Sequence, residues 1–358
     1  MKIHRYERLE DLLPQYKAAF QQAEKLSFDC SLAWFENLTG TTLSPHDKLM
    51  IFVADDEQGQ IVLLPMCLRA ARQFQPRTLR TLTNFYTSLY SPIASNNEAV
   101  RLLTYAIQCI IESRLDWDVI DFSPLSMEHD SYLSLYKALL SHRLPRFSYF
   151  CFDNWYLLVQ GRSYDEYFNG LPSRLKNTVK RKSKQFHAVD GARLDLMSEP
   201  NGEELDMGIA NYVKVYNSSW KVHEPYPHFM PGLIRLCCRQ GWLRMGFAYF
   251  HDQPIAVQIW IVCHGRAAIY KLAHDEKFDS YSVGSVLTAH IMRHVLDVDK
   301  VQEVDYLIGC ETYKRDWMSH KRERRGIVAY NPRTMFGLLG AVKQALGEFR
   351  RKFLALIH

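Results

Sequence analysis

Three consecutive strand patterns between residues 242 and 275 constrain this 358-residue chain more than any other feature of its sequence. The segment WLRMGFAYFH alternates apolar and polar residues, PIAVQIWIVCH is almost entirely apolar, and AAIYKLAHD alternates again. The connections at His251–Pro254 and His264–Arg266 are too short for a crossover helix, so they predict an antiparallel meander. Because helical patterns precede and follow it, we expect an α+β fold.

The rest of the chain divides into two halves of similar content. Each half contains a strand hairpin, a helix and a further strand, and the hairpin of the first half turns at Asp55–Gly59. We therefore expect two related domains with mixed or antiparallel sheets and flanking helices, followed by a C-terminal amphipathic helix. The predicted boundaries are 1–152, 153–333 and 334–358.

The second half is predicted to build its helices and outer strands around the meander. Apolar residues at steps of three and four indicate helices, and short apolar runs indicate strands. The expected strands are 154–160, 192–198 and 303–309, and the expected helices are 163–188, 203–221, 228–240 and 282–297.

The composition is that of a globular protein, with 47% hydrophobic residues, 23% charged residues and a formal charge of +5. The eight cysteines form no C-x-x-C pair, so no zinc or redox motif is indicated, and most lie inside apolar runs, which favours a reducing, cytoplasmic compartment. The polar N-terminus is unlike a signal peptide, and no run approaches the roughly 20 apolar residues of a membrane span. The histidines are scattered and do not have the spacing of metal ligands, so we expect no metal site.

The segment after the meander carries a specific resemblance. A helix opening with YSVGSVL, a strand EVDYLIG and the sequence ETYKRDW follow one another. This order resembles the C-terminal domain of the FemAB-like and CelD-like branch of the GNAT acyltransferase superfamily, whose members have tandem domains. The basic segment LPSRLKNTVKRKSKQF is similar to the helix that opens that domain. The matching residues are Ser282, Gly284, Leu287, Asp305, Gly309, Glu311, Tyr313, Lys314 and Trp317.

The resemblance implies an acyltransferase. It would move an acyl group, with acetyl-CoA as the expected donor, to an amine or hydroxyl of a sugar, an envelope or polysaccharide precursor, or an amino acid. Direct attack is expected, since no cysteine or serine lies in a nucleophile motif. The alternatives are a FemAB-type transferase that uses aminoacyl-tRNA and a non-catalytic protein that binds envelope precursors.

Two groups of residues are expected to bind the donor. Backbone N–H groups at a helix start bind phosphate oxygens, and Gly284 would allow close approach. In the resembling fold, the strands at 267–275 and 303–309 splay apart, and an N–H freed between them binds the thioester carbonyl. The expected donor-binding residues are Leu272, Ala273, His274, Ser282, Val283, Gly284 and Ser285. An ordinary capped helix and a continuous sheet are the alternatives.

The ionisable residues after the strand at 303–309 are the candidate catalytic groups. A carboxylate at a strand end can act as a base or position the acceptor, a lysine can anchor an anion, and a tyrosine can protonate the leaving group. The candidates are Asp305, Glu311, Tyr313 and Lys314. The alternative for Asp305 is a structural ion pair with Lys314 or Arg315.

The candidate substrate-binding residues are basic or aromatic. The helix expected at 163–188 carries six basic residues on one face, which suits an anionic donor, tRNA or a lipid head group, or is simply solvated. The aromatic segment TNFYTSLYSP at 83–92 is either an acceptor groove or a packed loop. The residues chosen are Tyr86, Tyr90, Arg174, Lys180, Trp220 and His223.

The C-terminal segment predicts an amphipathic helix with one apolar stripe. Its members follow each other at steps of three and four: Leu339, Val342, Leu346, Phe349, Phe353 and Leu356. Arg350, Arg351 and Lys352 flank the stripe. Either the stripe packs on the protein itself or on a second copy in a homodimer, or it holds the protein weakly at the inner membrane.

Overall fold

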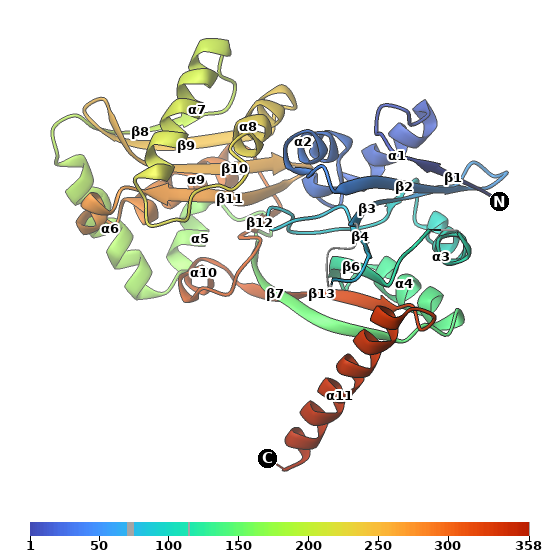
Figure 1. Cartoon of the computed structure of the whole chain (residues 1–358). Helices are drawn as coiled ribbons and strands as arrows, with labels where there is room; N and C mark the ends of the chain where they lie inside the picture. Colours follow the sequence, from blue (N-terminus) through green and yellow to red (C-terminus); the bar gives the residue numbers. More distant parts are fainter. Residues whose placement is uncertain (70–74, 114, 358) are drawn as a thin grey trace. The chain divides into compact units, whose positions relative to one another are not determined.

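The chain is organised as two compact units (Figure 1). The first unit combines Met1–Phe152 with Glu323–His358, and the second is the continuous segment Asp153–Arg322. The structure is a computed structural model that describes residues 1–69, 75–113 and 115–357, with side chains described as far as Arg351 in the last helix. The side chains of Lys352, Phe353 and Leu356 therefore lie outside the described residues.

The first unit contains part of one sheet, together with its helices. Its strands are β1 (Lys2–Tyr6), β2 (Asp47–Asp55), β3 (Ile61–Arg69), β4 (Thr78–Thr81), β5 (Ile93–Ala94), β6 (Val119–Ser126), most of β13 (His320–Tyr330) and the first half of β7 (Arg146–Leu158). Its helices are α1 (Pro14–Ala23), α2 (Leu32–Thr42), α3 (Leu102–Glu112), α4 (Asp130–Ser141) and α11 (Met335–Ile357).

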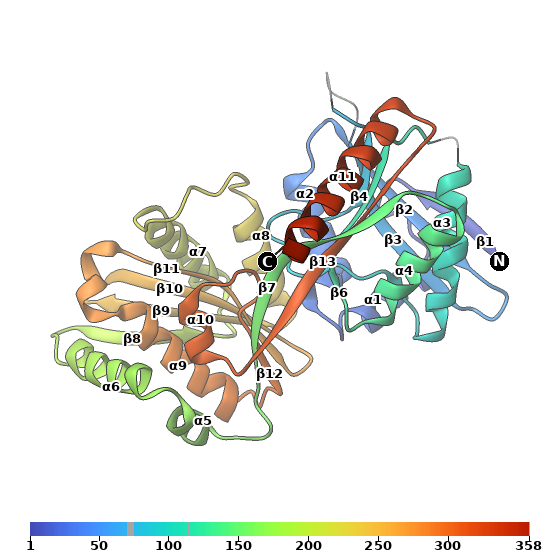
Figure 2. The same ribbon diagram turned by 90° about the horizontal axis from the view of Figure 1, so that it is seen from below.

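The second unit contains the other strands of the same sheet, with helices on both faces. Its strands are the second half of β7, β8 (Ala192–Met197), β9 (Leu243–Phe250), β10 (Gln253–Cys263), β11 (Arg266–His274) and β12 (Glu303–Asp305). Its helices are α5 (Tyr164–Gly170), α6 (Ser173–His187), α7 (Gly202–Asn217), α8 (Phe229–Arg239), α9 (Val283–Asp297) and α10 (Thr312–Trp317). Figure 2 shows α5, α6 and α9 on one face of the sheet and α7 and α8 on the other.

The two parts of the sheet have the same order of strand directions. In the first unit the order is β1, β2, β3, β4, β6, β13, and the β4–β6 pair alone among these neighbours is parallel. In the second unit the order is β8, β9, β10, β11, β12, β7, and the β11–β12 pair is the parallel one. The expected α+β fold with two similar halves is confirmed.

The core of the second unit explains why its central elements form. Strand β10 lies between β9 and β11 and has helices over both of its faces. Its side chains are therefore buried on both sides, which explains why its sequence is almost entirely apolar. Helix α9 packs on this sheet with nearly every apolar residue of its inner face buried. Those residues are Val283, Val286, Leu287, Ala289, Ile291, Met292, Val295 and Leu296.

Several elements differ from the sequence prediction. The helix expected at 163–188 is two helices, because Pro172 restricts Leu171 to extended backbone (φ −67°, ψ 156°). The strand expected at 154–160 begins earlier, at Arg146. Residues 323–333 were assigned to the second domain, but Arg324–Tyr330 pair with β6 of the first unit.

Within the described part of the chain, none of the helices combines the length and hydropathy that crossing a membrane requires.

Candidate active site

The first turn of α9 is fixed to the meander by a buried polar side chain. The amide of Gln258, which is 2% exposed in β10, donates to the carbonyl of Gly284 at 2.9 Å and to Thr288 Oγ1 at 2.8 Å. Trp260 Nε1–H donates to Gln258 Oε1 at 2.9 Å and holds the amide in this orientation. The start of α9 is therefore held at a defined place beside the sheet.

The expected donor-binding residues come together at this helix start. Ser282 precedes the helix in the left-handed conformation (φ 49°), and the N–H of Ser285 donates to its carbonyl. Val283 is fully buried, whereas an added Cβ on Gly284 would meet only His274 Nδ1, at 3.7 Å. His274, at the end of β11, also contacts Asp279 Oδ1 through Nε2 at 2.6 Å. A small side chain at position 284 would therefore meet no close contact.

Strand β12 separates from β11 at the expected place. The parallel register joins Arg266–Ala268 to Glu303–Asp305 and goes no further, although β11 continues to His274 along β10. The following residues stay beside β7, because Tyr306 N–H donates to the Trp155 carbonyl at 2.9 Å. The part of β11 that contains Leu272 and Ala273 thus extends beyond its pairing with β12.

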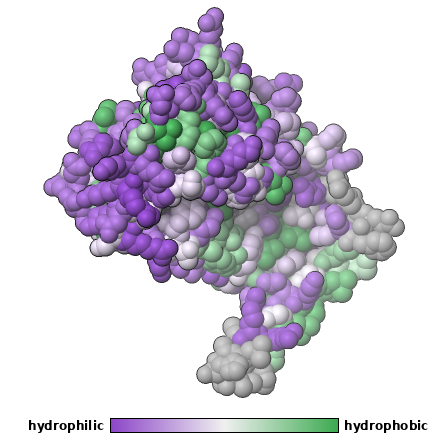
Figure 3. Space-filling view, turned by 90° about the vertical axis from the view of Figure 1, so that its left-hand side faces the viewer, coloured by the Kyte–Doolittle hydropathy of each residue, from purple (hydrophilic) through white to green (hydrophobic). Residues whose placement is uncertain are grey.

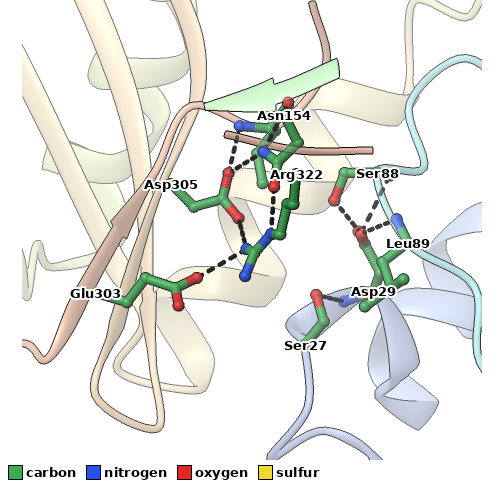
Figure 4. Close-up of polar contacts among 9 residues, drawn as sticks. Ser27, Asp29, Ser88, Leu89, Asn154, Glu303, Asp305 and Arg322 are labelled. Carbon is green, nitrogen blue, oxygen red and sulfur yellow. Dashed lines mark hydrogen bonds and ion pairs between the residues drawn. The ribbon is translucent and has the colours of Figure 1, made fainter. Parts of the chain in front are cut away.

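Asp305 lies in a buried ion-pair network rather than at the end of a long strand (Figure 4). One carboxylate oxygen contacts Arg322 at 2.6 Å, and the other accepts from the Leu307 N–H at 2.6 Å and from the Asn154 amide at 2.5 Å. Arg322 also contacts Glu303 at 2.8 Å. Its side chain and those of Asp305 and Glu303 are 10–12% exposed.

This network sets the course of the chain after β12. Leu307 adopts a positive φ of 56°, which is uncommon for a residue with a branched side chain, and Asp305 satisfies its N–H. Burial opposes the charge of Arg322, but Asp305 and Glu303 raise its pKa above the ordinary value. The cation that pairs with Asp305 is therefore Arg322, and the carboxylate orients the turn that leads to the other candidates.

The turn continues into a second polar cluster. Lys314 is 5% exposed; its ammonium donates to the Ile308 carbonyl and contacts Glu311 at 2.9 Å. Burial alone would raise the pKa of Glu311, but hydrogen bonding by Lys314 lowers it below the ordinary value. Tyr313 is 43% exposed, and its pKa is raised by partial burial and by Glu311. Gly309 has a φ of 118°, which favours glycine, and an added Cβ would also require the side-chain ends of Glu311 and Lys314 to move.

Two further lysines, which the sequence analysis did not select, belong to the same cluster. Lys271 on β11 contacts Glu224 at 2.7 Å. The pKa of Lys221 is lowered to about 8, chiefly by burial and to a smaller extent by repulsion from Lys271 and Lys314. Attraction from Glu224 opposes this shift only in part. The cluster, which we call the lysine cluster, consists of Lys221, Lys271, Lys314, Glu224 and Glu311.

The candidate substrate residues of the second unit lie around this cluster and along α6. Trp220 is 50% exposed and its ring lies 4.6 Å from that of His274. His223 is exposed and its Nδ1 lies 3.3 Å from the Asn217 side chain. Arg174 and Lys180 are exposed on α6, and Lys182 of the same helix contacts the Ser280 carbonyl just before α9.

Tyr86 and Tyr90 lie in the first unit and are only 3% and 2% exposed. Their loop is held by Asp29, whose carboxylate accepts from the Ser88 N–H at 3.1 Å and the Leu89 N–H at 2.9 Å (Figure 4). This burial favours the packed-loop alternative. No group of residues suited to a metal ion occurs in the part of the chain that the structure describes.

The comparisons with known proteins agree with this geometry. Residues 173–315 match the family model described as an acetyltransferase (GNAT) domain. A search of curated proteins finds no match. Among solved structures, FemX has a TM-score of 0.60 at 8% identity, covering 91% of this chain and 97% of FemX.

Two other solved structures have similar folds. A tandem GNAT protein from the clavulanic acid biosynthesis pathway has a TM-score of 0.52 at 9% identity, covering 93% of this chain and all of that one. The C-terminal domain of a putative lysylphosphatidylglycerol synthetase from Agrobacterium fabrum has a TM-score of 0.53 at 9% identity, covering 92% of this chain and 95% of that one. The resemblance to the FemAB-like tandem GNAT fold is thus confirmed.

Proposed function

We propose that this chain, which has the FemAB-like tandem GNAT fold and a GNAT acetyltransferase domain at residues 173–315, transfers an acyl group from acyl-CoA to an amine or hydroxyl of an anionic acceptor. The acceptor classes remain those expected from the sequence: a sugar, an envelope or polysaccharide precursor, or an amino acid. The observation that carries the proposal is the separation of β12 from β11 beside the start of α9.

The donor site rests on the geometry of that helix start. The first N–H groups of a helix and its dipole favour phosphate oxygens, and Gly284 leaves room for them. The acyl-bearing arm would then lie along the unpaired part of β11, where Leu272–His274 supply backbone groups for the thioester carbonyl. The basic α6, which contacts Ser280 through Lys182, adds positive charge near the phosphates.

The acceptor is expected to be anionic because of the lysine cluster. Three ammonium groups and two carboxylates leave an excess of positive charge, and an acceptor carboxylate or phosphate would offset it. Trp220 offers an exposed ring beside His274 for a sugar or another flat group.

Reaction would proceed by direct attack. The acceptor nitrogen or oxygen forms a bond to the thioester carbon and gives up its proton, the carbon–sulfur bond breaks, and the thiolate takes up one proton, so that the products are the acylated acceptor and free thiol. Tyr313, whose raised pKa keeps its hydroxyl protonated, is the proposed relay: it gives its proton to the sulfur while the proton released by the acceptor replaces it. Asp305 acts as a positioning residue through the Leu307 turn.

The donor is identified by native mass spectrometry of the freshly purified protein, in which bound CoA would appear as a mass increment. Aminoacyl-tRNA is the alternative, supported by the exposed basic residues of α6. Raising salt from about 50 to 200 mM weakens binding by roughly 10³–10⁵-fold for a protein with 6–10 phosphate contacts, and CoA binding should change far less. A protein that binds precursor without turnover with either donor would be the non-catalytic alternative.

A substitution at Gly284 tests the phosphate site. Gly284→Asp places a carboxylate where the phosphates are expected, and affinity for acetyl-CoA should fall at least tenfold, or about 1.4 kcal/mol. Gly284→Ala is the matched control, because its Cβ meets His274 only at ordinary contact distance and should leave affinity nearly unchanged. Calorimetry measures the acetyl-CoA affinity of both folded variants. If the two variants bind acetyl-CoA equally well, the pyrophosphate does not bind at this helix start.

A further inference from the structure

Helix α11 exposes a continuous row of large apolar side chains. Met335, Leu339, Val342, Leu346 and Phe349 follow one another at steps of four and three and are 50–71% exposed. We call this row the α11 stripe. Figure 3 shows hydrophobic colour along one side of this helix, at the lower right. Soluble surfaces rarely carry so long an apolar row without a use for it.

The opposite side of α11 fixes the helix to the first unit. A Cβ on Gly337 would collide with the backbone of Asn331 and Asp118, and one on Gly340 would meet the Tyr330 ring at 2.6 Å. Ala341 on the same side is 7% exposed. Because these small residues allow close packing, the helix cannot turn the stripe inward without losing those contacts.

The charges around the stripe are mostly positive. Lys343 and Arg350 directly follow stripe residues, which places them at its border about 100° around the helix. The sequence of α11 contains four basic residues and one acid, Glu348. Arg351 and Glu348 of α11 line a cavity of about 660 Å³ in the first unit. Arg146 and Arg325 line the same cavity.

We propose that α11 lies in the surface of a membrane that contains anionic lipids, with the stripe in the apolar layer and the basic residues at the phosphate level. Such an arrangement matches an amphipathic helix whose apolar face is bordered by lysine and arginine. A second copy of α11 fits less well, because two such stripes would bring Lys343 and Arg350 against like charges instead of acids.

Vesicle co-sedimentation of the full chain tests this proposal. The natural protein should pellet with vesicles of phosphatidylglycerol and phosphatidylcholine, and much less with phosphatidylcholine alone. Leu339→Gln with Leu346→Gln should lower partitioning at least about tenfold by removing apolar area without changing charge. Lys343→Gln with Arg350→Gln should lower it by about fivefold per residue, and less at high salt.

The matched control is Leu133→Gln with Leu140→Gln on α4, where both leucines are also about half exposed. It should pellet like the natural protein. Light scattering of each protein without vesicles gives the oligomeric mass. The proposal is overturned if the natural protein does not pellet, if the control loses binding equally, or if the protein is a dimer that the stripe variant converts to a monomer.

Discussion

Arg322→Met is expected to lower the free energy of unfolding by about 3–5 kcal/mol. The substitution keeps a long aliphatic chain but leaves Asp305 and Glu303 buried without their common cation, and uncompensated buried charges carry costs of that size. Urea denaturation followed by circular dichroism measures the change. The turn at Leu307 should loosen as well, so hydrogen exchange of the Leu307 amide should accelerate.

The neighbouring lysine provides the control for this variant. Lys321 is 45% exposed and contacts Asp153 at 3.2 Å, so Lys321→Met should cost only about 0–1 kcal/mol. A second comparison adds Asp305→Asn and Glu303→Gln to Arg322→Met. Removing all three charges should recover part of the lost stability. If Arg322→Met costs no more than Lys321→Met, the network does not hold the turn.

Lys221→Met is expected to make the protein more stable at pH 7 and far less active. The natural lysine has an ordinary pKa of 10.5 that the folded protein lowers to about 8, chiefly by burial. At pH 7 the folded state therefore holds a proton that its surroundings disfavour, at a cost of up to about 3 kcal/mol. Loss of the cation should slow acyl transfer by roughly 10²-fold or more if it orients an anionic acceptor.

The pH dependence distinguishes this explanation from simple repacking. The unfolded chain keeps the proton up to about pH 10.5, whereas the folded protein loses it near pH 8. Stability of the natural protein should thus rise between these values, and the advantage of Lys221→Met should shrink over the same range. Thermal melts from pH 7 to 10.5 measure this, and thiol release from acetyl-CoA with a small-molecule extract measures activity.

Lys214→Met is the matched control, because this lysine is exposed on α7 in the same unit. It should change neither stability nor activity appreciably. A Lys221→Met protein that is less stable at every pH, or one with unchanged thiol release, would contradict the assigned role of the lysine cluster.

The parts of the fold that follow from local patterns were predictable. The meander lies at 243–274 and the helix expected at 282–297 is α9 at Val283–Asp297, because apolar periodicity there reflects burial on known faces. The strand expected at 303–309 ends instead at Asp305. The sequence stays apolar after Asp305, but the Leu307 N–H donates to the Asp305 side chain instead of to a neighbouring strand. Leu307 also has a positive φ, which no sequence pattern predicts for a leucine.

The candidate site was predictable only where one segment carries it. His274, Ser282, Gly284, Glu311 and Lys314 could be proposed because they lie close together in the sequence, between residues 274 and 314, and their roles stay predictions. The partners that define their surroundings come from elsewhere: Asn154 is 151 residues from Asp305, and Lys271 is 47 residues from Glu224. Lys314 is only 5% exposed, whereas a lysine in a sequence is ordinarily expected to lie in solvent.

The sheet of the first unit is completed by β13, a strand that the ribosome makes almost last. The second unit is one continuous segment, so it can close its sheet during synthesis, while β6 waits for Arg324–Tyr330. At ~5–20 residues per second, that wait lasts roughly 10–40 s. During it, β6 presents an open edge to other nascent chains, and a fragment that stops at Phe152 would keep that edge permanently. Expression of the first half alone should therefore yield aggregates, whereas the segment from Asp153 to Arg322 is the part suited to separate production.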